Sequence, residues 1–524
     1  MLANLSRDAK FRIFLTILSA IGLVLILLTT SKYGAGVSSD AARNLSTADS
    51  LLAGKGFVDM IGSPFVLWPP LYPLVMAGLS LLTGWSTFQA AWYLNVALYA
   101  VNLWLSGWLL YQIFKQKLIY AIAGALIVLL SRSTLRIYAN VASEPLFATF
   151  MLLYFLVAAH YLQNSSRLAV WGMFVLAGLA MLQRYLGVVL FGVAAVAVFY
   201  KERWRGILRA LAPAVISALP IAAWVVLHNL PQSGALFGPR DLGEMLPLEN
   251  IGLSLTKILW WFIPRLSFTD PILLHPWMVI AAVVLALVLL NRRGYWQNWF
   301  RRLADIYVWP ALLFSVVYFF LLAFTVVTAD HLDLTSDRYY VVILPAVIAL
   351  VFITLDMLVL SHLPATGRPS AYAFPIMLII WFVYPAYSIQ AYVREALVKG
   401  EPTNYNIANS MLFREMRVVK AAESILAKDP TAPVYSNYIN IVWFIFRHRV
   451  RTLPFEDQTL PPDQRLVALR QSYPGWPPER GYIIWFTPNQ YHHIAAPAEL
   501  ATFVKLELLY EDKTGQIYIV QPGK

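Results

Sequence analysis

Residues 38–73 read SSDAARNLSTADSLLAGKGFVDMIGSPFVLWPPLYP and interrupt a chain that is otherwise mostly apolar. An apolar run, residues 13–30, precedes this stretch, and nearly everything after it up to residue 390 is also apolar. The stretch itself carries Asp40, Asp49 and Asp59, is rich in Gly, Ser and Pro, and closes on the stiff sequence WPPLYP. A loop this long costs ordering entropy and contributes little core. We therefore predict that it carries function.

The composition around this loop predicts a polytopic α-helical membrane protein. Apolar residues make up 59% of the chain and charged residues 13%, whereas charged residues form roughly a quarter of a soluble domain. Several apolar runs reach the roughly 20 residues that cross a bilayer. Basic residues precede the first run and no small-residue cleavage site follows it, as in an uncleaved signal anchor.

The net charge of +12 does not indicate a nucleic-acid partner. Many basic residues lie in short loops at one set of helix ends, which the positive-inside rule places in the cytoplasm. The chain has no cysteine, so disulfides and thiolate metal sites are excluded.

The apolar runs predict about eleven transmembrane helices, with the N-terminus in the cytoplasm and the C-terminus outside. The short apolar piece at residues 71–82 could be a further span, but Lys115 and Lys117 would then lie outside. We interpret it as a juxtamembrane helix that returns to the same side, because every later loop then obeys the same rule. The predicted spans are residues 13–30, 90–114, 118–130, 146–162, 168–182, 186–200, 207–227, 273–290, 306–327, 341–360 and 372–390.

This topology divides the chain into two predicted domains. Residues 1–392 form the membrane domain, with residues 31–70 as its first outer loop. Residues 393–524 form an extracytoplasmic α/β domain, with a helix at 411–428, strands at 432–437 and 481–486, a helix at 462–472 and a hairpin at 506–520. Residues 440–446 fit either a helix or a strand. An interfacial helix is expected at residues 258–263, and residues 131–145 are expected to form an outer loop.

The outer loops hold nearly all the acidic residues of the membrane domain, so chemistry is expected on that side. Asp40 is either a charge at the start of a helix or a functional carboxylate. Arg43, one turn later, could hold that carboxylate ionised or bind a phosphate. Asp49 and Asp59 are expected to be solvated.

Two further outer positions carry the same ambiguity. Glu144, before Pro145, is either a helix N-terminal charge or a functional group. Arg184 interrupts two apolar helices, where an ionisable residue is a functional candidate unless it snorkels to the headgroups. Asp333 and Arg338 either pair with each other or bind phosphate. The histidines show no metal-ligand spacing, and no metal is assigned.

Several motifs resemble the GT-C membrane glycosyltransferases, especially the protein O-mannosyltransferases and lipid A aminoarabinose transferases. The first-loop pattern D-x-x-x-N-L-x-x-A-x-x-L-L-x-G-x-G-F, starting at Asp40, is followed by G-x-P-F-x-x-W-P-P-L-Y-P. The motifs SEPLF at 143–147, GLAMLQRY at 178–185 and DLTSDRYY at 333–340 continue the resemblance. It covers most of the first 390 residues and implies inverting transfer of a sugar from a polyprenyl-phosphate carrier to an outer-face acceptor.

The resemblance also implies roles for single residues. Asp40 would be the general base that takes the acceptor hydroxyl proton, and Glu144 would position the acceptor or a metal. Substrate or phosphate binding is implied for five residues: Arg43, Arg184, Arg240, Arg338 and Tyr339. Many relatives have a second acidic residue after the loop aspartate, where this chain has Ala41, and an aromatic residue where it has Asn44. No cofactor is therefore certain, although a divalent cation is possible.

The implied partners are a polyprenyl-phosphate-linked sugar donor, membrane lipids and a protein, lipid or glycan acceptor, in the plasma (inner) membrane. Two rival functions remain at this point. A transporter or lipid flippase favours charged residues at the bilayer midplane and related halves, and the sequence has neither. The second rival function is a non-catalytic membrane assembly subunit. Ala41, in place of the second acidic residue of many relatives, is some support for it.

Overall fold

The computed structural model describes residues 5–239, 251, 254–255, 257–258, 261–262, 288, 296–327, 336–358, 368–400, 408–489, 491 and 493–522. The chain forms two compact units. The helical unit comprises Met1–Leu28, Val66–Tyr72 and Tyr93–Arg394, and the mixed unit comprises Thr29–Phe65, Pro73–Trp92 and Glu395–Lys524. The domain ranges 1–392 and 393–524 stay a prediction.

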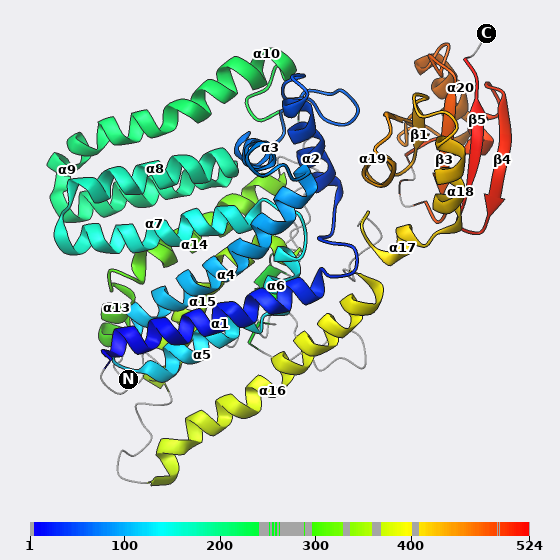
Figure 1. Ribbon diagram of the computed structural model, residues 1–524. Coiled ribbons are helices and arrows are strands. Elements are labelled where there is room, and N and C mark those ends of the chain that lie inside the picture. Colours follow the sequence, from blue (N-terminus) through cyan, green and yellow to red (C-terminus); the bar gives the residue numbers. More distant parts are fainter. Residues whose placement is uncertain are drawn as a thin grey trace. The chain divides into compact units, whose positions relative to one another are not determined.

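The helical unit is a bundle of apolar helices. α7 (Glu144–Asn164), α8 (Arg167–Gln183) and α9 (Val188–Trp224) lie side by side (Figure 1). Gly178 lets α8 and α9 approach closely, since a Cβ there would lie 2.4 Å from the Ser217 carbonyl oxygen. The other helices of this unit are α1 (Arg7–Thr29), α4 (Thr87–Ile113), α5 (Leu118–Leu129), α6 (Arg132–Tyr138), α10 (Leu230–Ser233), α13 (Trp296–Leu303), α14 (Trp309–Val327), α15 (Leu344–Leu358) and α16 (Arg368–Lys399).

The chain is an integral membrane protein. Among the described residues, six helices are long and apolar enough to cross a membrane, or seven if the bent pair α5 and α6 forms one span. Three shorter apolar helices accompany them. Helices occupy every predicted span except residues 273–290, of which the structure describes only residue 288. The expected interfacial helix at 258–263 is described only at residues 258, 261 and 262. The total of eleven spans stays a prediction.

Two predicted loops have more structure than expected. The outer loop at 131–145 was predicted without secondary structure, but it contains α6, whose N-cap Ser131 accepts a hydrogen bond from the Thr134 N–H. A turn was predicted between residues 200 and 207, but only one residue there has a non-helical conformation. Arg203, with φ of 57° and ψ of −148°, breaks α9, so that two predicted helices follow each other directly (Figure 1).

The mixed unit contains a five-stranded sheet with strand order β2-β1-β3-β5-β4. β1 (Val434–Ser436) lies parallel to β2 (Val450–Thr452) and β3 (Gly481–Phe486), whereas β5 (Gly515–Val520) runs antiparallel to β3 and to β4 (Leu506–Asp512). The predicted strands and the hairpin are present, and β2 is an additional strand. The remaining elements are α2 (Ser39–Leu52), α3 (Leu71–Thr83), α17 (Met411–Arg414), α18 (Arg417–Leu426), α19 (Ile439–Phe446), α20 (Pro462–Ser472) and α21 (Pro497–Leu500).

One helix prediction in this unit was wrong. Residues 411–428 were predicted as a single helix, but α17 ends at Arg414 and α18 begins at Arg417. Met416 lies between them in an extended conformation. The Thr514 hydroxyl oxygen accepts a hydrogen bond from the Val418 N–H at 3.1 Å, so the sheet turn supplies a partner at the new helix start. Residues 440–446, left open between helix and strand, are helical in α19.

Candidate functional site

In the helical unit, Glu144 begins α7 and is almost completely buried. Arg184, which follows the last residue of α8, approaches the Glu144 Oε1 with its Nη1 at 2.7 Å. The same guanidinium nitrogen donates a hydrogen bond to the Ser143 Oγ at 3.0 Å. A carboxylate with so little solvent contact stays ionised at low cost only beside a cation. The ends of α7 and α8 are therefore joined by a buried ion pair.

A second arginine lies next to this pair. The Arg338 Nε is 4.0 Å from the Glu144 Oε1, and its Nη2 donates to the Tyr339 hydroxyl at 2.7 Å. Both guanidinium groups also lie near the buried Tyr339 ring, at 4.8 Å for Arg338 and 5.9 Å for Arg184. Glu144, Arg184, Arg338 and Tyr339 are called the Glu144 cluster below.

The charges of the Glu144 cluster suit an anionic ligand. Within the cluster, two guanidinium groups lie near one carboxylate, so the charges of these three side chains sum to plus one. The Arg338 side chain is 38% exposed, against 18% for Arg184. Arginine offers several N–H donors in a fixed plane and binds phosphate in a bidentate manner. The cluster can therefore bind a phosphate through Arg338, while Glu144 holds Arg184.

A network beneath the cluster fixes the start of α7. The Asn102 Nδ2 in α4 donates to the Tyr138 hydroxyl at 2.7 Å and to the Pro145 carbonyl at 2.8 Å. The Asn102 Oδ1 accepts from the Thr149 hydroxyl at 2.8 Å. All these side chains are buried, where an unmade hydrogen bond is expensive. The network therefore ties α4, α6 and α7 together directly below Glu144.

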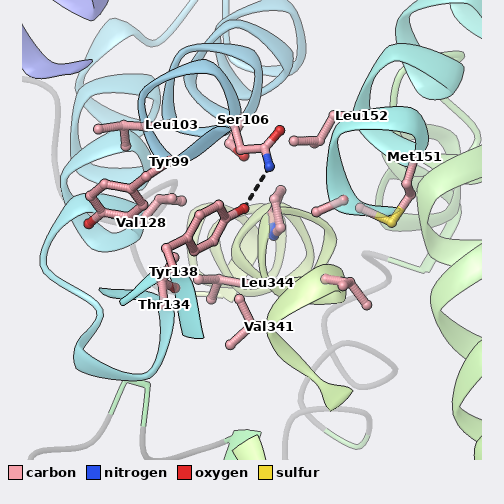
Figure 2. A pocket seen from close by; sticks show the side chains of 14 residues that line it. Tyr99, Leu103, Ser106, Val128, Thr134, Tyr138, Met151, Leu152, Val341 and Leu344 are labelled. Atoms are coloured by element: carbon pink, nitrogen blue, oxygen red, sulfur yellow. Dashed lines mark hydrogen bonds between the residues drawn. The ribbon is translucent and has the colours of Figure 1, made fainter. Parts of the chain in front are cut away.

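A small cavity adjoins this network. Figure 2 shows the Tyr138 side chain pointing into it, with the hydrogen bond to Asn102 drawn, among apolar side chains that include Leu103, Met151 and Leu152. Its volume is about 20 Å³, enough for a single water molecule but not for a sugar. We therefore assign the residues around this cavity to positioning α7 rather than to binding a substrate.

In the mixed unit, Asp40 lies in the first turn of α2. The helix cap is Ser38, whose side chain accepts a hydrogen bond from the Ala41 N–H at 3.3 Å. The Asn44 Nδ2 donates to the Asp40 carbonyl at 2.7 Å. Asp40 is half-buried. Because Ser38 already caps the helix, the Asp40 carboxylate is not needed for that task.

Arg43 and Asp59 form another ion pair with a buried carboxylate. The Arg43 Nη1 lies 2.9 Å from the Asp59 Oδ2, while the Asp59 Oδ1 accepts from the Ile61 and Ser63 N–H groups at 3.0 Å each. Burial raises the pKa of Asp59, and Arg43 and the two N–H groups oppose that rise. The prediction that Asp59 is solvated was wrong, because the turn at 59–63 folds the carboxylate inward.

Several further contacts hold α2 and the segment before it. The Asp49 carboxylate accepts from the Thr87 hydroxyl at 2.6 Å and lies 3.2 Å from the Arg447 Nη1. Burial raises the pKa of Asp49, although both contacts act against that rise. The Ala408 N–H donates to the Val37 carbonyl at 2.9 Å, and Asn409 donates to the carbonyls of Tyr33 and Ala35. The residues after 394 thus help to fix the helix that carries Asp40.

The structure brings together four of the predicted site residues, Glu144, Arg184, Arg338 and Tyr339. Asp40 and Arg43 belong to the mixed unit. Arg240 and Asp333 lie outside the described residues. Among the described residues, no three His, Asp or Glu side chains gather as metal ligands, and the possible divalent cation stays a prediction.

The sequence analysis missed the polar residues of α4. Asn95 and Asn102 are two helical turns apart on one face of an apolar helix. Paired amides in such a helix indicate a packed polar network, and this spacing was the available signal.

Comparisons with known sequences find no matching family model and no matching curated protein. Solved structures do match. ArnT from Cupriavidus metallidurans in the apo state has a TM-score of 0.59 and 15% identity over 97% of both chains. The same protein bound to undecaprenyl phosphate has a TM-score of 0.52 and 14% identity, over 97% of this chain and 98% of that one.

Two other glycosyltransferases match less completely. The mycobacterial arabinofuranosyltransferase AftD has a TM-score of 0.52 and 15% identity, over 99% of this chain and 40% of its own. The oligosaccharyltransferase of Archaeoglobus fulgidus, in complex with Zn and sulfate, has a TM-score of 0.52 and 11% identity. The match covers 96% of this chain and 72% of that one. This chain therefore has the GT-C fold, as the sequence motifs predicted.

Proposed function

We propose that this chain is an inverting glycosyltransferase that moves a sugar from a polyprenyl-phosphate carrier to an acceptor on the extracytoplasmic face. The observation that carries the proposal is the Glu144 cluster, where two arginines share one buried carboxylate in a chain of GT-C fold. A similar structure, ArnT, binds undecaprenyl phosphate. A lipid-linked phosphate is the anion that such a cluster suits in a membrane protein.

In this proposal the arginines stabilise the departing phosphate. As the bond between the sugar C1 and the phosphate oxygen breaks, the electron pair stays on that oxygen, and negative charge grows there. The Arg338 side chain is more exposed than that of Arg184 and contacts the phosphate. Glu144 and Ser143 orient Arg184. Fixed positive groups at a site of developing charge are a major source of catalysis.

Asp40 acts as the general base. It takes the proton of the acceptor hydroxyl as that oxygen attacks C1 from the face opposite the phosphate, so the configuration at C1 inverts. This role is the one that the sequence resemblance implies; in the structure Ser38 caps α2 and the Arg43 guanidinium pairs with Asp59. Arg43 is then a structural residue, although its exposed part also suits phosphate binding.

The remaining features of the proposal come from the sequence. Basic inner loops and acidic outer loops support about eleven spans, a cytoplasmic N-terminus and an extracytoplasmic α/β domain in the plasma (inner) membrane. The sugar is a hexose or pentose, and the acceptor is a protein, a lipid or a glycan.

The proposal is tested with the full chain in lipid vesicles. Undecaprenyl phosphate carrying a labelled sugar is supplied together with an envelope extract as the source of acceptor. We expect free undecaprenyl phosphate to appear in step with label on the acceptor. Movement of the intact labelled carrier across the vesicle membrane would contradict the proposal in favour of a transporter, and carrier binding without turnover would favour an assembly subunit.

A further inference from the structure

Four polar atoms around the start of α7 are buried and have no hydrogen-bond partner among the residues that the structure describes. They are the Asn95 Oδ1, the Asn140 Oδ1, the Gln183 Oε1 and the Tyr72 hydroxyl. Exposure of the whole residue is 0% for Asn95, 1% for Tyr72 and 2% for Gln183. Buried polar atoms in native proteins are nearly always paired, so unpaired ones need an explanation.

The residues that carry these atoms belong to, or contact, the segment that links α6 to α7. The Asn95 Nδ2 donates to the Asn140 carbonyl at 2.6 Å, and the Gln183 Nε2 donates to the Ser143 carbonyl at 2.9 Å. The Tyr72 hydroxyl lies near the Asn95 side chain, the Ala142 N–H and the charge of Glu144, but none of these is a hydrogen-bond partner of proper geometry. One short segment thus gathers all four residues beside the Glu144 cluster.

The orientation of the amides is fixed by their other contacts. Each amide nitrogen of Asn95 and Gln183 donates to a backbone carbonyl. The Asn140 Nδ2 likewise donates to the Arg136 carbonyl at 2.8 Å. Turning any of these amides over would set two carbonyl oxygens against each other. The three unpaired amide atoms are therefore oxygens, which accept hydrogen bonds and cannot donate them.

A ligand that satisfies three acceptors and one hydroxyl must bring several donors. An ionised phosphate brings none, whereas a sugar ring brings one on each hydroxyl. The neighbouring arginines have the opposite character and suit the phosphate. We infer that Tyr72, Asn95, Asn140 and Gln183 bind the hydroxyls of a sugar whose phosphate lies at the Glu144 cluster. This inference rests on the proposed function and specifies the polyhydroxylated part of its substrate.

Tyr72→Phe removes one unpaired hydroxyl and nothing else, which makes it the sharpest test. Tyr154→Phe is the matched control, because the Tyr154 hydroxyl is equally buried but donates to the Leu190 carbonyl at 3.1 Å. The purified full chain would be titrated with undecaprenyl phosphate and with the same carrier bearing mannose, glucose or arabinose. We expect Tyr72→Phe to lose affinity about tenfold for the sugar-linked carrier that the parent prefers, and to bind the bare carrier normally.

The thermal stability of the same variants gives an independent readout. Removing an unpaired buried hydroxyl leaves no group unsatisfied, so the melting temperature of Tyr72→Phe should equal or exceed that of the parent. Tyr154→Phe loses a hydrogen bond, so its melting temperature should fall, while its preference for the sugar-linked carrier should not change. If Tyr72→Phe binds every probe as the parent does, ordered water occupies these atoms and the inference is overturned.

A second pair of variants uses the two amides of α4. Asn95→Leu removes an unpaired acceptor together with the donor to the Asn140 carbonyl, whereas Asn102→Leu, two turns along the same helix, removes an amide whose hydrogen bonds are all made. Loss of sugar preference only in Asn95→Leu supports the inference, and equal loss in both overturns it.

The titrations also separate this inference from the proposed function. A parent protein that binds bare undecaprenyl phosphate but prefers none of the three sugar-linked forms would overturn the inference alone. A parent that binds neither kind of carrier would overturn the proposed function as well.

Discussion

Two of the described ion pairs with a buried carboxylate, Glu144–Arg184 and Asp59–Arg43, look alike but differ in the contacts around them. Glu144 and Arg184 have side chains that are 6% and 18% exposed, and Asp59 and Arg43 have side chains that are 2% and 32% exposed. Asp59 also accepts two backbone N–H groups, so its pair is electrically neutral and complete. Glu144 is shared with Arg338 and lies beside unpaired acceptors. A second nearby arginine and unpaired acceptors distinguish the proposed binding site from a pair that serves only the fold.

Breaking the Glu144 pair should give the largest loss of stability. Glu144→Ala leaves the buried Arg184 guanidinium without its carboxylate, and losing one partner of a buried pair costs about 3–5 kcal/mol. We expect a strongly lowered melting temperature in detergent and poor accumulation in membranes. Glu395→Ala, in the exposed pair with Lys399, is the control and should cost about 0.5 kcal/mol or less. Equal effects would contradict the distinction drawn between the pairs.

Breaking the Asp59 pair should cost less and should depend on pH. Arg43→Met removes a partly exposed cation, but the two N–H groups remain, so we expect a loss of about 1–3 kcal/mol at pH 7. Burial already raises the pKa of Asp59 in the folded protein, and the variant raises it further. The folded state then keeps the Asp59 proton to higher pH than the unfolded state does.

The sign of the pH effect follows from that proton. The free energy of unfolding falls as the pH rises from the pKa of Asp59 in the unfolded state, near 4, through its pKa in the folded state. This fall is larger in the variant. The difference in melting temperature between parent and Arg43→Met should therefore be smaller near pH 4 than at pH 7. A difference that grows on acidification would show that Asp59 is not the group Arg43 neutralises.

Changing Arg338 should affect binding rather than stability. Arg338→Lys keeps the charge but loses the planar set of donors that suits phosphate. We expect about tenfold weaker binding of undecaprenyl phosphate, with little change in melting temperature because the side chain is 38% exposed. Arg209→Lys, in an exposed pair with Glu202, is the matched control and should bind the carrier normally. Normal binding by Arg338→Lys would remove Arg338 from the phosphate site.

The smallest effect is expected at Asp49. Asp49→Asn loses an exposed ion pair with Arg447, which is worth about 1 kcal/mol or less, and can keep its hydrogen bond from Thr87. Melting temperature and sugar transfer should both stay close to those of the parent. A large loss of transfer would mean that the wrong carboxylate of α2 has been assigned to the chemistry.

The sequence predicted the elements better than the partners of the charged residues. The apolar runs predicted most helices, and motif order predicted the GT-C fold. Arg43 was considered as a partner for Asp40, one turn away, but it pairs with Asp59 across a turn. The approach of Arg338 to Glu144, almost two hundred positions away, was not predicted, and Asp333, its predicted partner, lies outside the described residues. Spacing along a helix predicts local pairs, whereas these pairs depend on how separate segments pack.

Polar residues in apolar helices were the least predictable part of the site. In Asn95 and in Gln183, the amide nitrogen donates a hydrogen bond, whereas the amide oxygen has no partner among the described residues. Only coordinates reveal which atoms of an amide are used. The kink at Arg203 was equally hidden, because a positive φ at an arginine has no signal in composition.

Asp40→Asn tests the central claim most directly. The substitution keeps the size of the side chain and removes the base, and Asp49→Asn in the same helix is the matched control. Sugar transfer from undecaprenyl-phosphate-linked donors would be measured with the full chain in vesicles, with melting temperature and carrier binding measured in parallel. We expect Asp40→Asn to lose transfer by about a hundredfold or more, while its folding and carrier binding stay normal. Transfer at the parental rate in Asp40→Asn would contradict the account.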